Sequence, residues 1–195
     1  MKIEKIYIPE ILWETEQFNP LAVVTYLSTI EKSGVSGACK TCWDLAPELG
    51  GNTCFNNSMD GILTPKGETR SVWWAYKLYA ESLNKRYATK NIDDELVTLS
   101  YADENDATTL IIGNISKIQT KTLNLSFSNL LPNSLINKNK SGVLKLSEVI
   151  NNGSNVLDKP KLILQKKVSV KNNSISVQLK SINPSSLYYL KISDK

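Results

Sequence analysis

The stretch Ile11–Gln17, which reads ILWETEQ, places two glutamates inside an otherwise apolar run that is typical of a buried strand. Because alternate side chains of a strand share a face, we expect Leu12, Glu14 and Glu16 on one face, with Glu16 at the carboxyl end. Burying an unpaired carboxylate is costly, so two acids on a core strand indicate a partner, a metal ion or chemistry. These residues alone fit an exposed edge strand equally well, and both acids would then be solvated.

A helix and a second strand are expected next. Asn19-Pro20 is a helix start signal, and Gly34 is a stop signal. The apolar residues between them recur at helical spacing, at Leu21, Val24, Leu27 and Ile30. A strand is predicted over Val35–Leu45 and, after a loop, an aromatic helix over Arg70–Arg86. This alternation predicts parallel strands covered by helices. Two such units cannot form a stable sheet alone, so we expect them to belong to something larger.

The aromatic helix should pack through one apolar stripe. At helical spacing this stripe comprises Val72, Tyr76, Tyr79 and Leu83, with Trp73 adjoining. Trp73 and Trp74 are therefore expected to pack within the protein rather than to bind a ligand.

From about Asp93 the sequence changes to short, β-rich runs separated by clusters of Asn, Ser, Gly and Asp. Seven strands are predicted, at Leu96–Tyr101, Thr108–Asn114, Lys121–Phe127, Val143–Val149, Lys161–Val170, Ser174–Leu179 and Leu187–Ile192. Hairpin turns are expected at residues 103–106 and 171–173, and a polar loop at Asn133–Ser141. Seven short strands predict an antiparallel β-sandwich.

The composition is that of an ordinary globular protein, with 195 residues, 41% hydrophobic and 22% charged. The net charge of +4 comes from scattered lysines and not from a basic block interleaved with aromatics, so no nucleic-acid partner is expected. The sequence contains no apolar run of about 18 residues and no signal-peptide pattern. We therefore expect no membrane partner.

The chain has three cysteines and no histidine, so neither a metal site nor a cofactor is expected. Cys39 and Cys42 have the CxxC spacing, but they fall in a strand-like run where residues three apart face opposite sides. This favours two small, buried packing residues, with redox or metal use as the alternative.

The order of these elements resembles the C-terminal part of clan A retaining glycoside hydrolases, closest to the β-xylosidase and α-iduronidase family (family 39-like). Thr15–Asn19 (TEQFN) is similar to the end of the seventh barrel strand of that family, with one inserted residue before Phe18. Asp60–Arg70 (DGILTPKGETR) resembles the turn before the last barrel helix, and Trp74–Lys77 (WAYK) resembles the start of that helix. The resemblance implies an α/β plus all-β chain. Residues 1–90 would be the last two strand-helix units of a (β/α)8 barrel, and residues 91–195 an accessory β-sandwich.

The resemblance also implies a site. Glu16 would be the nucleophile, with Glu14 as the alternative or a supporting residue. Trp43 would form a platform for the sugar, and Asp44 would lie near it, although a tryptophan at a strand end also serves as plain packing. The substrate would be an oligosaccharide or another glycoside.

The chain alone is predicted to be inactive. Retaining hydrolysis needs two carboxyl groups roughly 5 Å apart, flanking the glycosidic bond. Glu14 and Glu16, about 6.6 Å apart on one strand with parallel side chains, would not flank that bond. The acid/base glutamate would come from the missing N-terminal barrel segment, which is the expected partner. A non-catalytic carbohydrate-binding or interaction β-sandwich is the alternative function.

Overall fold

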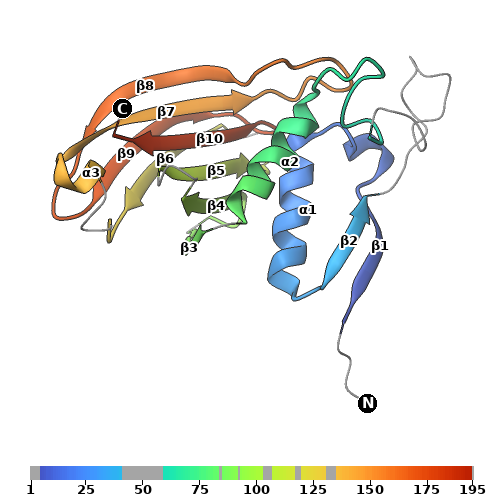
Figure 1. Cartoon of the computed structure of the whole chain (residues 1–195), viewed down its shortest axis with the longest axis horizontal. Coiled ribbons are helices and arrows are strands. Elements are labelled where there is room, and N and C mark those ends of the chain that lie inside the picture. The colour runs from blue at the N-terminus through green and yellow to red at the C-terminus, as the bar shows by residue number, and fades with distance from the viewer. Residues whose placement is uncertain are drawn as a thin grey trace. The chain divides into compact units, whose positions relative to one another are not determined.

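The structure is a computed structural model that describes residues 5–40, 59–83, 85–91, 93–102, 107–116, 120–130 and 135–194. The chain forms two compact units (Figure 1). Unit 1 comprises Met1–Tyr79 and Val149–Pro160, and unit 2 comprises Ala80–Glu148 and Lys161–Lys195. Unit 1 therefore includes a segment that the chain inserts between two strands of unit 2.

Unit 1 contains a strand, a helix and a second strand that pairs in parallel with the first. These are β1 (Tyr7–Ile11), α1 (Pro20–Ser33) and β2 (Gly37–Lys40). Tyr7 pairs with Gly37 and Ile11 with Lys40, so the predicted parallel pairing across a helix is confirmed. The sheet has only these two strands among the described residues.

Helix α1 begins and ends at the predicted signals. The side chain of Asn19 accepts hydrogen bonds from the backbone N–H of Leu21 at 3.0 Å and of Ala22 at 3.4 Å. Pro20 occupies the first turn, and Gly34 ends the helix with a φ of 73°. Two residues of the predicted apolar face, Leu21 and Val24, are buried, whereas Leu27 and Ile30 are half-buried.

The strand predicted over Ile11–Gln17 is wrong. Strand β1 ends at Ile11, and Leu12 has a φ of 71°, a left-handed conformation that breaks an extended strand. Glu14–Glu16 form a 3₁₀ helix, in which the backbone N–H of Glu16 bonds to the carbonyl of Trp13 at 2.9 Å. Leu12, Glu14 and Glu16 therefore do not share a strand face.

The second predicted strand is only partly described. β2 covers Gly37–Lys40, and residues 41–45 of the prediction lie outside the described residues. Cys39 is exposed on β2, so its interpretation as a buried packing residue is wrong. Cys42 lies outside the described residues.

The aromatic helix is shorter than predicted. Helix α2 covers Ser71–Ser82, and the chain then forms a short strand, β3, at Arg86–Tyr87. The fully buried apolar residues of the helix are Val72, Ala75 and Leu78. Of the predicted stripe, Val72 is buried, Tyr76 and Tyr79 are half-buried and Leu83 is 56% exposed. After Val72, the buried positions of α2, Ala75 and Leu78, therefore each lie one residue before the predicted positions, Tyr76 and Tyr79.

The tryptophans of α2 have contacts within unit 1. The rings of Trp73 and Trp74 meet edge to face, with centroids 4.8 Å apart. The indole N–H of Trp74 donates to the carbonyl of Leu157 at 2.8 Å, and the hydroxyl of Thr69 donates to the same carbonyl at 2.9 Å. Ser71 adds a bond to the carbonyl of Ile150 at 2.6 Å. These bonds attach Val149–Pro160 to the start of α2.

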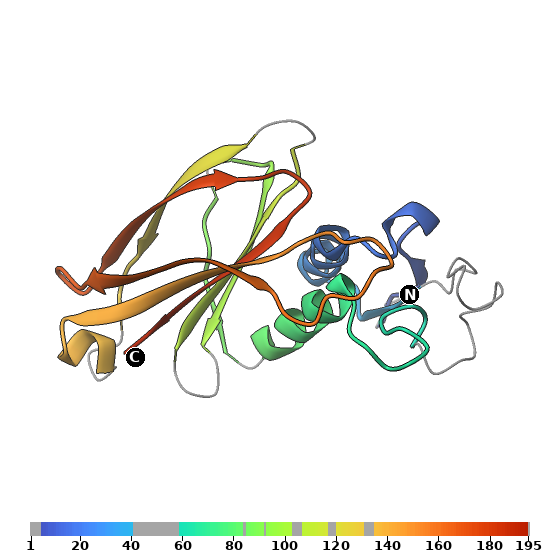
Figure 2. The same cartoon turned by 90° about the horizontal axis from the view of Figure 1, so that it is seen from above.

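Unit 2 is a β-sandwich, whose two sheets Figure 2 shows as separate layers. The larger sheet has the order β3-β4-β5-β10-β7-β8, and the smaller one consists of β6 and β9. The bounds after β3 are β4 (Leu96–Ala102), β5 (Thr108–Asn114), β6 (Lys121–Phe127), β7 (Ser141–Val149), β8 (Lys161–Ser169), β9 (Ile175–Ile182) and β10 (Leu187–Ser193). All seven predicted strands are present, and β3 is an additional one.

The loops that connect the strands of unit 2 agree in part with the turns and the loop predicted from the sequence. Lys171 and Ser174 exchange two backbone hydrogen bonds of 2.9 Å around Asn172 and Asn173, which both have positive φ, so the predicted turn is confirmed. The turn predicted at 103–106 lies outside the described residues. The predicted polar loop contains a short helix, α3 (Leu135–Lys138). No helix in the described part of the chain is long and apolar enough to cross a membrane.

A core of aliphatic side chains fills the space between the two sheets. On β9, Ile175, Val177 and Leu179 alternate with exposed residues, and their side chains are at most 4% exposed. They belong to one cluster with residues of the larger sheet, among them Leu144 and Leu190. This one-sided burial is the reason for the alternating sequence pattern.

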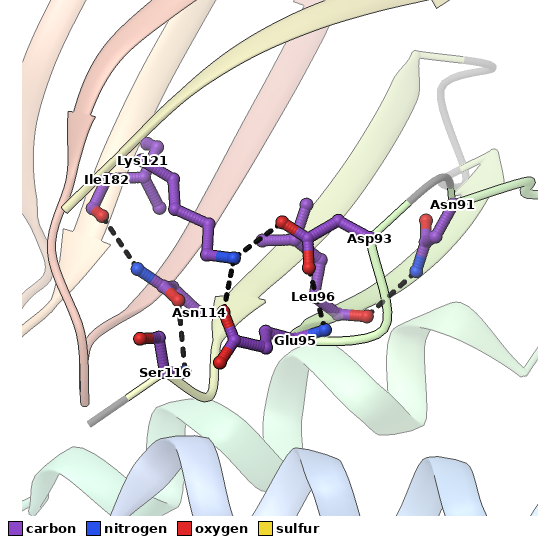
Figure 3. Close-up of polar contacts among 8 residues, drawn as sticks. All are labelled: Asn91, Asp93, Glu95, Leu96, Asn114, Ser116, Lys121 and Ile182. Atoms are coloured by element: carbon purple, nitrogen blue, oxygen red, sulfur yellow. Dashed lines mark hydrogen bonds and ion pairs between the residues drawn. The ribbon is translucent and has the colours of Figure 1, made fainter. Parts of the chain in front are cut away.

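A charged cluster joins β6 to the turn before β4 (Figure 3). The ammonium of Lys121 lies 2.5 Å from a carboxylate oxygen of Asp93 and 2.6 Å from one of Glu95. Its hydrogen bond with Asp93 is the main reason that the pKa of Lys121 is raised, and the same bond lowers the pKa of Asp93. The cluster therefore favours the charged form of each partner.

Replacing Lys121 by Met should lower the melting temperature at pH 7 and change its pH dependence. Because the pKa of Asp93 is lowered by folding, its contribution is present above about 3.9, the unfolded value, and is lost as the pH falls through the lower folded value. Because the pKa of Lys121 is raised, its contribution is present below about 10.4 and is lost as the pH rises through the folded value. Thermal scans from pH 2 to 11 would measure both contributions. The control is Lys180→Met, which replaces an exposed lysine of β9. Identical curves for the two variants would contradict the role of the cluster.

Candidate functional site

The candidate site lies at the carboxyl ends of β1 and β2, which are side by side because Ile11 pairs with Lys40 in a parallel ladder. Sites of parallel α/β folds gather at this edge, where the strands end and their loops begin. Two glutamates belong to this edge of unit 1. Glu10 is an exposed residue near the end of β1, and Glu16 ends the 3₁₀ helix that follows it.

Glu16 is held in the turn between β1 and α1. It is half-buried, and its Oε2 atom is buried without a hydrogen-bond partner in the described part of the chain. A hydrogen bond with the Glu16 carboxylate is the main cause that raises the pKa of Tyr26 on α1, and burial and the charge of Glu16 add to it. At neutral pH Tyr26 is therefore a phenol that donates toward Glu16.

The next residue has unused hydrogen-bonding capacity. Gln17 is only 1% exposed, and neither polar atom of its amide has a partner among the residues that the structure describes. Buried amides are normally paired, so such a group indicates a partner still to be supplied. The turn after β1 thus has two buried polar groups, on Glu16 and Gln17, that can accept further contacts.

A lysine ends the second strand. The ammonium of Lys40 donates to the backbone carbonyl of Asp60 at 2.8 Å. Burial lowers the pKa of Lys40, and the charge of Asp60 opposes that shift. Burial, with a further contribution from Asp60, raises the pKa of Tyr76 to about 12. At neutral pH this part of the site therefore holds the protonated phenol of Tyr76 close to the Asp60 charge.

Two of the sequence motifs that carry the family resemblance, Thr15–Asn19 and Asp60–Arg70, meet in space. Arg70 is completely buried, donates to the carbonyl of Gly61 at 3.1 Å and lies 5.1 Å from the centre of the Phe18 ring. Gly61 has a φ of 79°, and a Cβ atom there would lie 3.0 Å from the Phe18 ring. Asp60–Arg70 is thereby fixed against the TEQFN segment.

The loop Asp60–Arg70 is itself tightly folded. Leu63 pairs with Thr69, and the backbone N–H of Thr64 bonds to the carbonyl of Glu68 at 2.9 Å. The Thr64 hydroxyl donates to the Glu68 carboxylate and accepts from the Glu68 N–H, both at 3.1 Å. These bonds hold Thr64 and Glu68 together within the loop.

The structure brings together only part of the predicted site. Glu16 lies at the candidate edge, but the side chain of Glu14 and all of Trp43 and Asp44 lie outside the described residues. Glu10 was missed because the strand was placed too late in the sequence. The β-branched and aromatic run Ile6–Ile8, directly before Pro9, is the signal that could have found it.

No metal site is apparent in the described part of the chain, where no group of three or more His, Cys, Asp or Glu side chains is arranged to hold an ion.

Comparison with known proteins shows likeness in structure and not in sequence. No family model and no curated protein matches the sequence. The structure of N2152 from Neocallimastix frontalis matches 100% of this chain at 18% identity, with a TM-score of 0.74. The GH39 enzyme from Xanthomonas axonopodis pv. citri matches 98% at 9% identity, with a TM-score of 0.61. A family 44 xyloglucanase from Paenibacillus polymyxa matches 97% at 12% identity, with a TM-score of 0.53.

This chain spans less than half of each of those proteins, namely 46%, 45% and 32% of their lengths. At sequence identities of 18%, 9% and 12%, the likeness shows a shared fold and nothing more. The chain therefore shares the fold of the matched parts of these proteins, and the β-sandwich is its larger described part.

Proposed function

We propose that this chain is the C-terminal part of a retaining glycoside hydrolase, in which β1, α1, β2 and α2 form the last two strand-helix units of a (β/α)8 barrel and unit 2 is the accessory sandwich. The observation that carries the proposal is the parallel pair β1 and β2. Parallel sheets are normally covered on both faces and have more than two strands. Two further observations support the proposal that other strand-helix units complete the barrel. The Gln17 amide has no partner among the described residues, and the chain matches 45% of the length of a GH39 enzyme.

The proposed chemistry needs one carboxylate from this chain. A nucleophilic glutamate attacks the anomeric carbon and expels the leaving group, and a glycosyl-enzyme ester forms. A second carboxyl group, from the missing barrel segment, protonates the leaving oxygen and then removes a proton from the attacking water. Substrates are oligosaccharides or other glycosides, with Trp43 and Asp44 proposed as sugar contacts.

Two glutamates are candidates for the nucleophile. The sequence pattern favours Glu16, which the contact with Tyr26 holds in the turn. The observed end of β1 favours Glu10, because catalytic residues of such barrels lie at the carboxyl ends of strands. Glu10 is our preferred nucleophile for this reason, and Glu14 remains a supporting candidate.

Joining the chain to a barrel tests the proposal. The gene region upstream of Met1 should encode six strand-helix units, and the joined protein should hydrolyse aryl β-xylosides or β-glucosides with retention of anomeric configuration. The chain alone should show no hydrolysis, because the acid/base is absent. Proton NMR of the first-formed anomer would measure the outcome. Hydrolysis by the chain alone, or an inactive joined protein that is folded, would contradict the proposal.

A non-catalytic carbohydrate-binding sandwich is the second candidate function. It is favoured by a cleft in unit 2 that is lined by hydroxyl, amide and aromatic side chains.

A further inference from the structure

Unit 2 contains a cleft of about 620 Å³ beside strand β6. Its walls come from β3 and β4 on one side and from β6 on the other. The cleft exists because the smaller sheet has only two strands facing six, so that β6 is an edge strand in the described sheet. Clefts of about 300–1,000 Å³ are typical of small-molecule sites.

Three polar side chains of the cleft are held by hydrogen bonds within the protein. The Thr98 hydroxyl donates to the Asn91 Oδ1 atom at 2.6 Å, and the Asn91 amide donates to the Leu96 carbonyl at 2.8 Å, a bond drawn in Figure 3. The Ser100 hydroxyl donates to the Thr109 carbonyl at 3.3 Å. Thr98 and Ser100 alternate on β4, share one face, and are each 7% exposed.

These bonds leave hydrogen-bonding capacity for a ligand. The Asn91 amide has a second N–H, and both hydroxyls keep acceptor lone pairs. Because the side chains are already oriented, binding would cost little of their rotational freedom. The site therefore presents ordered donors and acceptors that carry no charge.

The lining also includes aromatic and apolar side chains. Tyr87 and Phe127 are half-buried, and Leu110 belongs to the sandwich core. Among the described residues the lining includes Lys85 and Lys90 but no aspartate or glutamate, so a cationic ligand would not be favoured. Aromatic rings beside neutral hydroxyl and amide groups suit a ligand with an apolar C–H face and many hydroxyls.

We propose that this cleft binds an oligosaccharide. A sugar ring would lie against Tyr87 or Phe127, and its hydroxyls would bond to Asn91, Thr98 and Ser100. An extended peptide that pairs with the edge of β6 is the competing occupant, but the specificity of strand addition comes from pockets for alternate side chains, whereas β4 presents hydroxyls here. The inference gives a location to the second candidate function, and it holds whether or not the chain takes part in hydrolysis.

Binding measurements on the full chain test the proposal without any assay of hydrolysis. Calorimetric titration with xylohexaose and with cellohexaose should show binding of at least one. Tyr87→Leu should weaken it about tenfold or more, because the ring contact is lost while apolar volume is kept. Thr98→Val should weaken it by a similar factor, because the hydroxyl is lost with little change in shape. Gln165→Ala, which removes an exposed amide of β8 outside the cleft, should bind like the wild type.

The outcomes separate the possible occupants. A peptide with the sequence of Ile175–Ile182, the strand that pairs with β6 on its other side, serves as the probe for strand addition. Binding of that peptide and of neither saccharide would overturn the proposal. Saccharide binding unchanged in both folded cleft variants would also overturn it, as would no binding by the wild type. Circular dichroism establishes that each variant is folded, and Ser100→Ala replaces Thr98→Val if that variant is not.

Discussion

Glu10→Gln in the chain joined to its barrel is expected to reduce kcat for aryl glycosides by about a thousandfold or more. The amide is similar in size to the carboxylate but cannot attack the anomeric carbon, so the glycosyl-enzyme does not form. Glu10 lies one residue before the end of β1, at the edge where Ile11 pairs with Lys40. Steady-state kinetics with a substrate that has a good leaving group would measure the loss.

The matched variant is Glu16→Gln. Glu16 lies in the turn and interacts with Tyr26 of α1, so its loss should disturb the position of the turn and reduce kcat by about tenfold. Azide offers a second readout, since a small anion can take the place of a deleted carboxylate in Glu10→Ala and yield a glycosyl azide. A larger loss in Glu16→Gln than in Glu10→Gln, with azide rescue of Glu16→Ala alone, would return the role of nucleophile to Glu16. Glu14→Gln tests the remaining candidate in the same assay.

The sandwich could be predicted from the sequence because its strands have one buried and one exposed face. On β9, buried Ile175, Val177 and Leu179 alternate with exposed residues, and this contrast marks both the strand and its bounds. The same contrast is absent from β1, where Tyr7, Pro9 and Glu10 are all exposed. The run Ile11–Gln17, whose first residue is the last of β1, gives the stronger signal and moves the predicted start of the strand four residues along the chain, from Tyr7 to Ile11.

The candidate site could be predicted only as separate motifs. The positive φ of Leu12 has no sequence signal, because leucine seldom adopts it, and without it the end of β1 cannot be located. The contact of Arg70 with Phe18 joins residues far apart in the sequence. A sequence pattern shows that each motif is present, whereas tertiary packing decides that they meet.

Arg70→Met is expected to lower the free energy of unfolding by about 1–3 kcal/mol. Arg70 is completely buried, and its guanidinium donates to the Gly61 carbonyl at 3.1 Å and lies over the Phe18 ring. Methionine keeps much of the volume but donates no hydrogen bond, so the carbonyl loses this donor and the ring loses its cation. Urea denaturation followed by tryptophan fluorescence would measure the change.

Lys77→Met is the matched control, because Lys77 lies 5.3 and 5.4 Å from the rings of Trp73 and Trp74 but is exposed to solvent. Its loss should cost at most about 1 kcal/mol, the usual value of an exposed cation–π contact. Gly61→Ala should be destabilising as well, since a φ of 79° is strained for alanine and its Cβ atom would lie only 3.0 Å from the Phe18 ring. Gly61, Phe18 and Arg70 form one contact. The double variant Gly61→Ala/Arg70→Met should therefore lose less free energy of unfolding than the sum of the losses in the two single variants. Strict additivity, or an Arg70→Met protein as stable as Lys77→Met, would show that the two motifs are not joined through this arginine.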